Sequence, residues 1–303
     1  MITAEGLTKR YGPRTAVDGI DFTVRPGLVT GFLGPNGAGK STTMRMIVGL
    51  DRPTAGSVLV NGRPYAEHRA PLREVGALLD AKAVHTGRTA EHHLLALAAT
   101  HRIGRRRVRE VIELTGLESV ARKRVGGFSL GMGQRLGIAA ALLGDPATLL
   151  LDEPVNGLDP EGVLWVRTLV RGLAAEGRTI LLSSHLMSEM AMTADHLIVL
   201  GRGRVIADAP VDAVVSAGTA PRVRVRSPQS SKLADLLSGP GVSVMRSEAG
   251  LLEVTGLEAH AIGDLAAFNA IAVHELTPAN ASLEEAYLAL TADAVEYRSE
   301  ALG

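Results

Sequence analysis

Hydrophobic and polar residues alternate with a period of two near the start of the chain, at residues 20–24 and 57–60. This alternation predicts half-buried strands, and Asn61 and Gly62 form a turn sequence directly after the second one. Between these segments, residues 29–33 are a largely apolar run, which predicts a buried strand. A glycine-rich loop follows that run, and a helix is expected from about Lys40 to Val48.

The middle of the chain has the spacing of helices and then returns to short apolar runs. Between residues 90 and 143, leucine, valine, isoleucine and alanine recur three and four positions apart, as on one face of a helix. The runs that follow have the lengths of buried strands and a connecting helix. The elements predicted there are a strand over 147–152, a helix over 162–175, a strand over 179–184 and a hairpin of strands over 196–200 and 204–207.

The pattern changes after about residue 218, where arginine and valine alternate over residues 221–227. Ser282 and Glu285 have the spacing of a capping box, which predicts a last helix from Ser282. The other elements predicted here are a helix over 230–237, strands over 242–244 and 251–254, a helix over 259–268 and a strand over 271–276. This order is ferredoxin-like. We therefore predict an α/β domain of residues 1–218 and a small α+β, ferredoxin-like C-terminal domain of residues 219–303.

The composition limits the classes of protein to which this chain can belong. Its 303 residues are 46% hydrophobic, and 32 Lys and Arg balance 32 Asp and Glu, so the formal net charge is zero. Binding of a nucleic acid is therefore not expected, because nucleic-acid binders carry a basic excess. The chain has no cysteine, which excludes disulfides and thiolate metal sites and is typical of a reducing cytoplasm.

Two further features concern the membrane. The first residues lack the basic region and apolar stretch of a signal peptide, so no signal peptide is expected. The most apolar window, residues 136–151, is interrupted by Asp145 and Pro146 and is shorter than the roughly 20 residues that span a bilayer. We expect any membrane-spanning part of the assembly to come from another chain.

The strongest chemical signal is the loop after the apolar run of residues 29–33. It fits the pattern G-x-x-x-x-G-K-[ST] with Gly34, Pro35, Asn36, Gly37, Ala38, Gly39, Lys40, Ser41 and Thr42. Glycines let consecutive backbone amides turn toward phosphate oxygens, and the amino end of the following helix favours negative charge. Lys40 can reach the β- and γ-phosphates of ATP, and Ser41 offers its hydroxyl to Mg²⁺. The loop therefore predicts ATP and Mg²⁺ as ligands.

Two acidic residues and a histidine follow later apolar runs. Asp152, after the run 149–151, can hold Mg²⁺ directly or through water, and Glu153 can polarise an attacking water. Taken alone, such a pair is compatible with a solvated strand end, but the phosphate loop upstream favours catalysis. His185 follows the run 180–184 and can bond to the γ-phosphate or the water; a capping or packed histidine is the alternative.

A second potential phosphate site lies at residues 128–135. Ser129 can cap the helix that follows, and the glycines after it leave the amino end of that helix accessible. A plain helix cap is the alternative interpretation. One chain then contains two helix ends suited to phosphate, whereas one nucleotide has a single triphosphate. A dimer in which each chain offers a different end to each ATP resolves this difference.

These motifs, in this order, resemble the ATP-binding cassette family over about residues 1–215. The matching positions are Tyr11 for the aromatic that stacks on adenine, residues 34–42 for Walker A, residues 128–132 for the signature motif (Ser129, Leu130, Gly131 and Met132 after a phenylalanine), residues 149–153 for Walker B, Asp159 in the D-loop, and His185 for the switch histidine. For Tyr11, a turn aromatic without a ligand is the alternative.

The resemblance implies a P-loop NTPase core of the ABC ATPase type with a helical subdomain, and a head-to-tail homodimer. It implies that Lys40, Glu153 and His185 act in catalysis, and that Ser129 of one chain completes the ATP site of the other.

The sequence departs from the family at two places. The signature has Leu130 where the family has glycine and Met132 where it has glutamine, so we expect contacts to the partner's ATP to persist through Ser129 and backbone amides. Asp80 stands where the family normally has a glutamine near Mg²⁺ and the attacking water. Aspartate is a better ligand for a hard metal, yet it adds negative charge near the γ-phosphate. Our hypothesis is that Asp80 contacts Mg²⁺ through water.

Within the family, the variant signature and the small C-terminal domain resemble ATPases that pair with six-helix permeases exporting drugs, antibiotics or lipids. The resemblance implies an ATP-hydrolysing subunit in the cytoplasm, at the inner face of the cell membrane, held there by a separate multi-helix permease. Residues 82–95 are expected to meet that permease, with an ordinary helical face as the alternative. They include Val84, His85, His92, His93 and Leu94.

Other functions fit part of the sequence. Import ATPases also carry C-terminal domains, though commonly small barrels. Cassette ATPases without a membrane partner usually have two cassettes or a long coiled coil between Walker A and signature. This chain has one phosphate loop and no sustained heptads in that interval, so export is the function predicted. For residues 219–303, which lack an aromatic cluster, we expect dimer contact or permease docking rather than ligand sensing.

Overall fold

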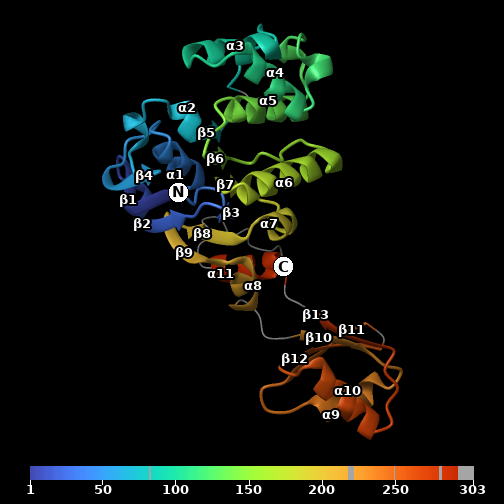
Figure 1. The fold of residues 1–303 in the computed structure, drawn as a ribbon. Coiled ribbons are helices and arrows are strands. Elements are labelled where there is room, and N and C mark those ends of the chain that lie inside the picture. Colours follow the sequence, from blue (N-terminus) through green and yellow to red (C-terminus); the bar gives the residue numbers. More distant parts are fainter. Residues whose placement is uncertain (82, 218–221, 249, 280–281, 293–303) are drawn as a thin grey trace. The chain divides into compact units, whose positions relative to one another are not determined.

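A computed structural model of the chain describes residues 1–81, 83–217, 222–248, 250–279 and 282–292 (Figure 1). Contacts between residues divide it into two compact units: Met1–Val211 together with the chain from Thr291 on, and Asp212–Leu290. The domain boundary predicted at residues 218 and 219 lies outside the described residues. Each unit has its own sheet and its own hydrophobic core, and each is described by itself below.

The first unit is built on two sheets. One is a six-stranded sheet with the order β5-β6-β7-β3-β8-β9, and the other is antiparallel with the order β2-β1-β4. Within the larger sheet only β9 runs antiparallel to its neighbour. The strands are β1 (Ile2–Tyr11), β2 (Arg14–Val24), β3 (Val29–Leu33), β4 (Ala55–Val60), β5 (Val75–Leu78), β6 (Thr148–Leu151), β7 (Thr179–Ser183), β8 (His196–Gly201) and β9 (Arg204–Pro210).

Burial explains why the central strands have no polar face. Every residue of β3, β6 and β7 is buried, as in parallel sheets covered on both faces. This is the reason that the predicted strands at 29–33, 147–152 and 179–184 read as continuous apolar runs. The hairpin predicted around residues 201–203 is also present, as β8 and β9.

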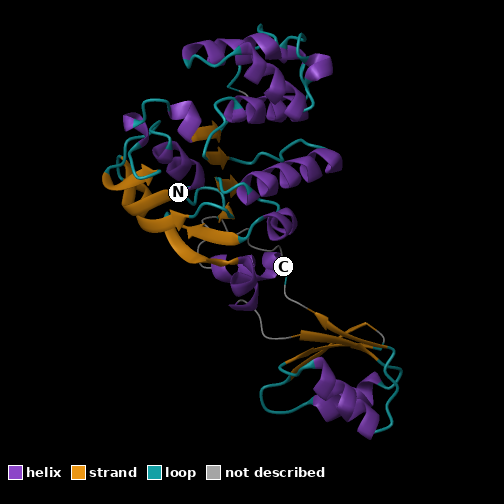
Figure 2. Cartoon of the chain, in the orientation of Figure 1, coloured by secondary structure: helices purple, strands orange, loops and turns teal. Residues whose placement is uncertain are grey.

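Helices cover the larger sheet and form a group of their own beyond β5. Figure 1 shows α3, α4 and α5 together at that end, and Figure 2 shows the antiparallel strands on another side of the unit. The helices are α1 (Lys40–Ile47), α2 (Pro71–Glu74), α3 (Ala90–Thr100), α4 (Arg105–Leu114), α5 (Leu130–Leu142), α6 (Pro160–Ala175) and α7 (Met187–Thr193), with 3-10 turns η1 (Tyr65–Glu67), η2 (Glu118–Val120) and η3 (Val125–Gly127). None of the helices in the described part of the chain has the length and apolar character that crossing a membrane requires.

Strand β1 is an element that the hydrophobic pattern did not predict. Its buried residues include Ile2, Ala4 and Leu7, and the pairing register with β2 shifts between Ala4 and Leu7. A bulge of this kind breaks the period-two alternation, so the sequence no longer has the regular pattern of a strand. Helix α6, in turn, begins two residues before its predicted start, because Asp159 caps it and Pro160 suits the first helical position.

The second unit contains a four-stranded antiparallel sheet with the order β11-β12-β10-β13. Helix α8 (Val211–Ala217) belongs to this unit from Asp212 on. The other elements are β10 (Arg222–Arg226), α9 (Ser230–Leu237), β11 (Ser243–Glu248), β12 (Leu251–Thr255), α10 (Ala259–Phe268), β13 (Glu275–Ala279) and α11 (Leu283–Thr291). The predicted order of strands and helices is therefore present. The ferredoxin-like assignment stays a prediction, which this strand order supports.

One strand of this unit is displaced from its predicted position. The prediction at 271–276 was wrong: the strand is Glu275–Ala279, and Ile271 instead packs in the core at the end of α10. Pro278 lies in this strand, which is tolerated because β13 is at the edge of the sheet. The capping box at the last helix is confirmed, since the amide of Glu285 donates to Ser282 Oγ at 3.1 Å and the amide of Ser282 donates to Glu285 Oε2 at 3.4 Å.

Strand β5 packs closely against α5 at Gly76, which generates a stability prediction. A Cβ at Gly76 would overlap the carbonyl oxygen of Ala141. We expect Gly76→Ala to lower the free energy of unfolding by about 1–3 kcal/mol or more, because main chain must move. Gly172→Ala is the matched control. Gly172 lies within α6 with open space around it, so this substitution should raise the free energy of unfolding by roughly 0.5–1 kcal/mol. Urea denaturation measures both, and equal stabilities of the two variants would contradict the packing argument.

Candidate functional site

The predicted site residues lie at the carboxyl ends of neighbouring parallel strands. Strand β3 leads into the loop 34–42, β6 into Asp152 and Glu153, and β7 into His185. The registers Leu151 with Leu182 and Phe32 with Ser183 bring these ends to one edge of the sheet. Chemistry scattered over about 150 residues of sequence is therefore gathered where open α/β sheets bind ligands.

The loop 34–42 borders a pocket of about 430 Å³, which is within the usual range for small-molecule sites. The pocket is lined by all of residues 35–42 together with Tyr11, Arg14 and Ala16. Gly39 precedes the first turn of α1 with φ of 104°, and a Cβ there would lie 2.7 Å from the carbonyl oxygen of Ala16. Only glycine is accommodated at that point of the loop.

Lys40 is held inside this loop. Its ammonium donates to the carbonyl oxygens of Gly34 at 2.6 Å and Pro35 at 3.3 Å. Burial lowers the pKa of Lys40, and the nearby Glu153 and Asp152 carboxylates offset part of that change by favouring the charged form. The lysine is thus a partly desolvated cation between the phosphate loop and the two acids.

Ser41 and Asp152 meet at one point although 111 residues separate them. Ser41 Oγ donates to Asp152 Oδ2 at 2.8 Å, and Ser183 Oγ donates to Asp152 Oδ1 at 2.5 Å. A hydroxyl and a carboxylate are hard oxygen ligands, so this pair fits Mg²⁺. Within the described residues no three His, Asp or Glu side chains form a metal cluster, so further ligands for such an ion would come from the nucleotide and water.

Glu153 and His185 form a pair beside Asp152. His185 Nδ1 lies 2.7 Å from Glu153 Oε2, and the backbone amide of His185 donates to the same oxygen at 3.3 Å. Glu153 itself has φ of 51°, in the left-handed region that residues with a Cβ rarely adopt. Backbone strain of this kind is found preferentially at functional sites, where surrounding contacts hold it.

Tyr11 lies on the rim of the same pocket. Its hydroxyl donates to Asp51 Oδ2 at 2.9 Å, and Arg45 pairs with the same oxygen at 2.8 Å. The ammonium of Lys9 lies 5.0 Å from the ring centre. The ring is therefore oriented by its hydroxyl while 47% of the residue stays accessible, so one face can receive a flat ligand.

The signature residues lie apart from the phosphate loop of their own chain. Ser129 caps α5, because its side chain accepts from the amide of Met132 at 3.2 Å, and no hydrogen bond among the described residues joins Ser129 to the loop 34–42. Leu130 packs over Gly157, and Gly131 faces the carbonyl oxygen of that glycine. Asp159 caps α6 by accepting from the amide of Gly162 at 2.9 Å.

Asp80 follows β5 and is exposed near the end of β6. The amide of Asp152 donates to the carbonyl oxygen of Leu78 at 2.8 Å, which sets the two segments side by side. In the segment 82–95, Lys82 lies outside the described residues, whereas His85 and His92 are exposed. Leu94 is fully buried in the helical group, so its inclusion in a contact surface was wrong.

Two residues of the site were not found from the sequence. Ser183 accepts from the amide of Glu153 at 3.0 Å while it donates to Asp152, so it fixes both acids. Gln134, on α5, donates from Nε2 to the carbonyl oxygen of Glu153 at 3.1 Å. A serine at a strand end and a glutamine in a helix carry no motif of their own, because their roles depend on partners 30 and 19 residues away.

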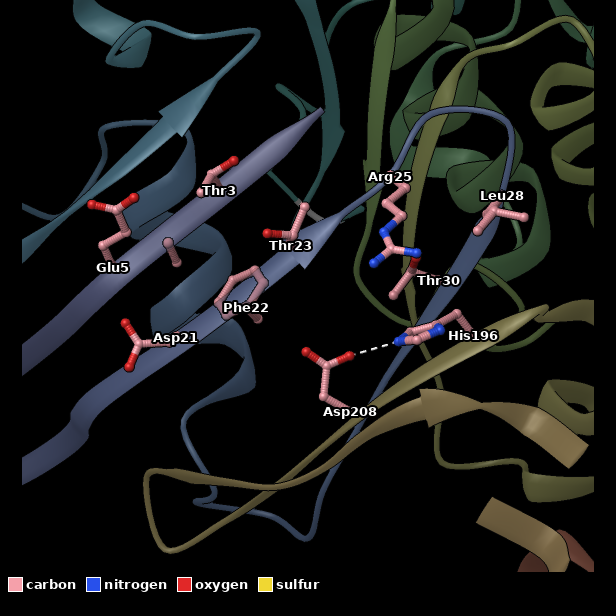
Figure 3. A pocket seen from close by; sticks show the side chains of 11 residues that line it. Thr3, Glu5, Asp21, Phe22, Thr23, Arg25, Leu28, Thr30, His196 and Asp208 are labelled. Atoms are coloured by element: carbon pink, nitrogen blue, oxygen red, sulfur yellow. Dashed lines mark hydrogen bonds and ion pairs between the residues drawn. The ribbon is translucent and has the colours of Figure 1, made fainter. Parts of the chain in front are cut away.

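A second pocket, of about 470 Å³, lies elsewhere in the first unit (Figure 3). It is lined by residues of β1, β2, β3, β8 and β9, and it contains none of the predicted site residues. Figure 3 shows His196 and Asp208 facing each other there, with Nε2 and Oδ1 2.6 Å apart. Its size is similar to that of the phosphate-loop pocket, but the motifs converge on the latter.

Comparison with protein families supports the choice of the phosphate-loop pocket as the functional site. The model of the family described as "ABC transporter" matches residues 17–156, and a domain of unknown function (DUF8746) matches residues 221–284. A model described as an AAA domain matches residues 123–191. The first match contains the phosphate loop, the signature helix and the two acids.

Curated relatives and a solved structure extend the similarity. The bacitracin transport ATP-binding protein BcrA of Bacillus licheniformis is 41% identical over 215 residues, 70% of each chain. An uncharacterized ABC transporter ATP-binding protein of Bacillus subtilis, YhcH, is 34% identical over 305 residues, covering 98% of this chain and 97% of the relative. The Nod factor export ATP-binding protein I of Rhizobium sp. is 39% identical over 221 residues, 71% of this chain and 72% of the relative. A dimeric bacterial ABC transporter cassette, MJ0796, has a TM-score of 0.64 at 25% identity, covering 69% of this chain and 98% of that one.

Proposed function

The chain belongs to the family of ATP-binding subunits of ABC transporters, and from this we propose that it hydrolyses ATP to drive export of an antibiotic-like or lipid-like substrate through a separate membrane permease. The observation that carries the proposal is the convergence of Lys40, Asp152 and Glu153 at one edge of the sheet. Export is supported by the relatives named for bacitracin transport and for Nod factor export.

In the proposed mechanism, the chain's residues act mainly by position and charge. Lys40 neutralises negative charge on the β- and γ-phosphates, and the loop amides hold their oxygens. Ser41 and Asp152 hold Mg²⁺, which when bound supplies positive charge to the phosphate oxygens. Glu153 accepts a hydrogen bond from the attacking water and orients it in line with the γ-phosphate, and His185 supports both that carboxylate and the phosphate. Tyr11 stacks on adenine.

We propose a head-to-tail homodimer as the working form. Ser129 to Met132 lie at the amino end of α5, and no hydrogen bond among the described residues joins Ser129 to the loop 34–42 of the same chain, which supports a role for this helix end at the ATP of a second chain. The dimeric cassette with a similar fold supports the formation of a dimer. Asp159, in the neighbouring D-loop, lies within the same proposed contact. ATP would favour the closed dimer, and hydrolysis with product release would reopen it.

The permease contact is proposed near residues 83–95, at the inner face of the membrane. Helix α3 begins within that segment, and at its other end, from Thr100 on, lies a pocket of about 500 Å³ lined by Arg69, Arg73, Arg102, His101 and four other residues, none of them acidic. This basic lining supports a protein contact with acidic side chains.

We also propose that the chain divides at residues 218 and 219. Residues 219–303 then form an accessory domain that contacts the second chain of the dimer or docks on the permease.

Replacement of Glu153 tests the catalytic assignment. Glu153→Gln keeps the shape of the side chain but removes the negative charge that accepts from water, so we expect ATP binding to persist while turnover falls by about 10²-fold or more. Steady-state phosphate release and binding of a fluorescent ATP analogue measure the two properties. Glu118→Gln, at an exposed position in η2, is the matched control and should retain activity. Near-normal turnover in Glu153→Gln would sink the assignment.

Asp80 gives a separate prediction about Mg²⁺. If its carboxylate contacts the ion through water, Asp80→Asn should raise the Mg²⁺ concentration for half-maximal ATPase activity by about tenfold. Asp264→Asn, an exposed carboxylate on α10, should leave that concentration unchanged. A crystal structure with Mg-ATP in which the carboxylate lies more than about 6 Å from the metal would remove the hypothesis.

Transport is tested with the membrane protein that accompanies the chain. We expect detergent extraction of native membranes to recover the chain with a multi-helix membrane protein, and expression of both to raise the bacitracin concentration that cells tolerate. Expression with Glu153→Gln in place of the native chain is the control and should give no protection. ATP-dependent uptake rather than efflux would indicate an importer, and repeated purification without a membrane protein would contradict the transport function.

A further inference from the structure

Gln134 is buried in the signature helix α5, where its side chain makes one hydrogen bond to the part of the chain that the structure describes. Its exposed fraction is 6%, and its Nε2 donates to the carbonyl oxygen of Glu153 at 3.1 Å. Its other polar atom, Oε1, is buried and has no hydrogen-bond partner within the described residues. A buried amide left half unsatisfied destabilises the fold relative to an apolar side chain of the same length. Stability alone therefore does not explain a glutamine here, and its bond to Glu153 needs a functional account.

Glu153 is held by contacts from strand β7, from the segment that follows β7 and from helix α5. Its amide donates to Ser183 Oγ of β7 at 3.0 Å, its carboxylate lies 2.7 Å from His185 Nδ1, and its carbonyl oxygen accepts from Gln134 of α5. These contacts hold a backbone with φ of 51°. Because that conformation is unfavourable for a residue with a Cβ, it depends on its surroundings, and the direction of the carboxylate depends on where α5 lies.

Helix α5 has a second contact with the same segment, one turn nearer its start. Leu130 packs over Gly157, which has φ of 73° and no Cβ, and Gly131 faces the carbonyl oxygen of Gly157. The first turns of α5 therefore contact the segment 153–157 at its first residue, Glu153, and at its last, Gly157. Ser129, which caps the same helix, is adjacent to Leu130.

We propose that Gln134 is a positioning residue that couples the amino end of α5 to the catalytic carboxylate of the same chain. The inference rests on the proposed function, in which Ser129 at that helix end meets the ATP bound by the second chain. Binding of that ATP fixes α5, and through Gln134 it fixes the carbonyl oxygen and thus the side-chain direction of Glu153. Each ATP site then depends on the occupancy of the other, because Ser129, at the amino end of α5, and Gln134, about one turn further along it, serve different sites.

Gln134→Met tests the coupling, because methionine has a similar length and no donor. We expect kcat for ATP hydrolysis to fall by about 10- to 100-fold, as for a displaced catalytic group, with KM within twofold. The Hill coefficient for ATP should fall from above 1 in the native chain to 1. The midpoint of thermal unfolding should be unchanged or higher, because the unsatisfied Oε1 is removed together with the bond.

Two controls separate positioning from a loss of structure. Leu136→Met changes another buried side chain of α5, one that has no polar atom to bond the backbone of Glu153, and it should keep both kcat and the Hill coefficient. Trp165 is the one tryptophan of the chain, and the Arg135 guanidinium lies 4.5 Å from its ring centre. An unchanged Trp165 emission spectrum in Gln134→Met shows that α5 keeps its place.

The outcomes distinguish this inference from the proposed function. It is overturned if Gln134→Met keeps kcat within twofold, if its loss of kcat comes with an equal loss in Leu136→Met or a shifted Trp165 emission, or if the native chain has a Hill coefficient of 1. If Glu153→Gln abolishes turnover in the same assays, the proposed function stands in each of those cases. If Glu153→Gln hydrolyses ATP normally, the proposed function is contradicted, and the inference that rests on it falls with it.

Discussion

The parallel pairing of β5, β6, β7 and β3 is the constraint on which the rest of the site depends. Parallel strands point the same way, so their carboxyl ends meet at one edge, and the residues just beyond those ends must become neighbours. The loop 34–42, the two acids after β6 and His185 after β7 are brought together in this way. Burial of both sheet faces fixes the register, because a shift by one residue would exchange the side chains that pack on the two faces and disrupt both packed layers.

One positive and two negative side chains lie close together at this edge of the sheet, and serine hydroxyls bond to the negative ones or to their backbone. Asp152 and Glu153 are adjacent carboxylates, and the one lysine of the loop is partly desolvated between them and the phosphate pocket. The hydroxyls of Ser41 and Ser183 hold Asp152 from two sides, and Ser183 also holds the amide of Glu153. Such an arrangement, with one cation beside oriented hydroxyls and carboxylates, fits the proposed binding of a nucleotide together with Mg²⁺.

The departure from the family's signature has a structural account in this chain. Leu130 stands where the resemblance implies glycine, and its side chain packs over Gly157 of the D-loop, a position with no Cβ to displace it. Leucine and glycine are complementary at this contact. The exchange therefore retains Ser129 as the cap of α5 while it ties the amino end of that helix to the segment that follows Glu153.

The sequence by itself determined the features that depend on neighbouring residues: the phosphate loop, the caps at Ser129 and Ser282, and most helices and buried strands. It did not determine strand β1, where a bulge breaks the alternation, or β13, where an edge position tolerates Pro278. Nor did it reveal Ser183 or Gln134 as parts of the site. Each of those side chains acts through a partner brought near by sheet register or helix packing, and such proximity is a property of the tertiary structure that leaves no local pattern in the chain.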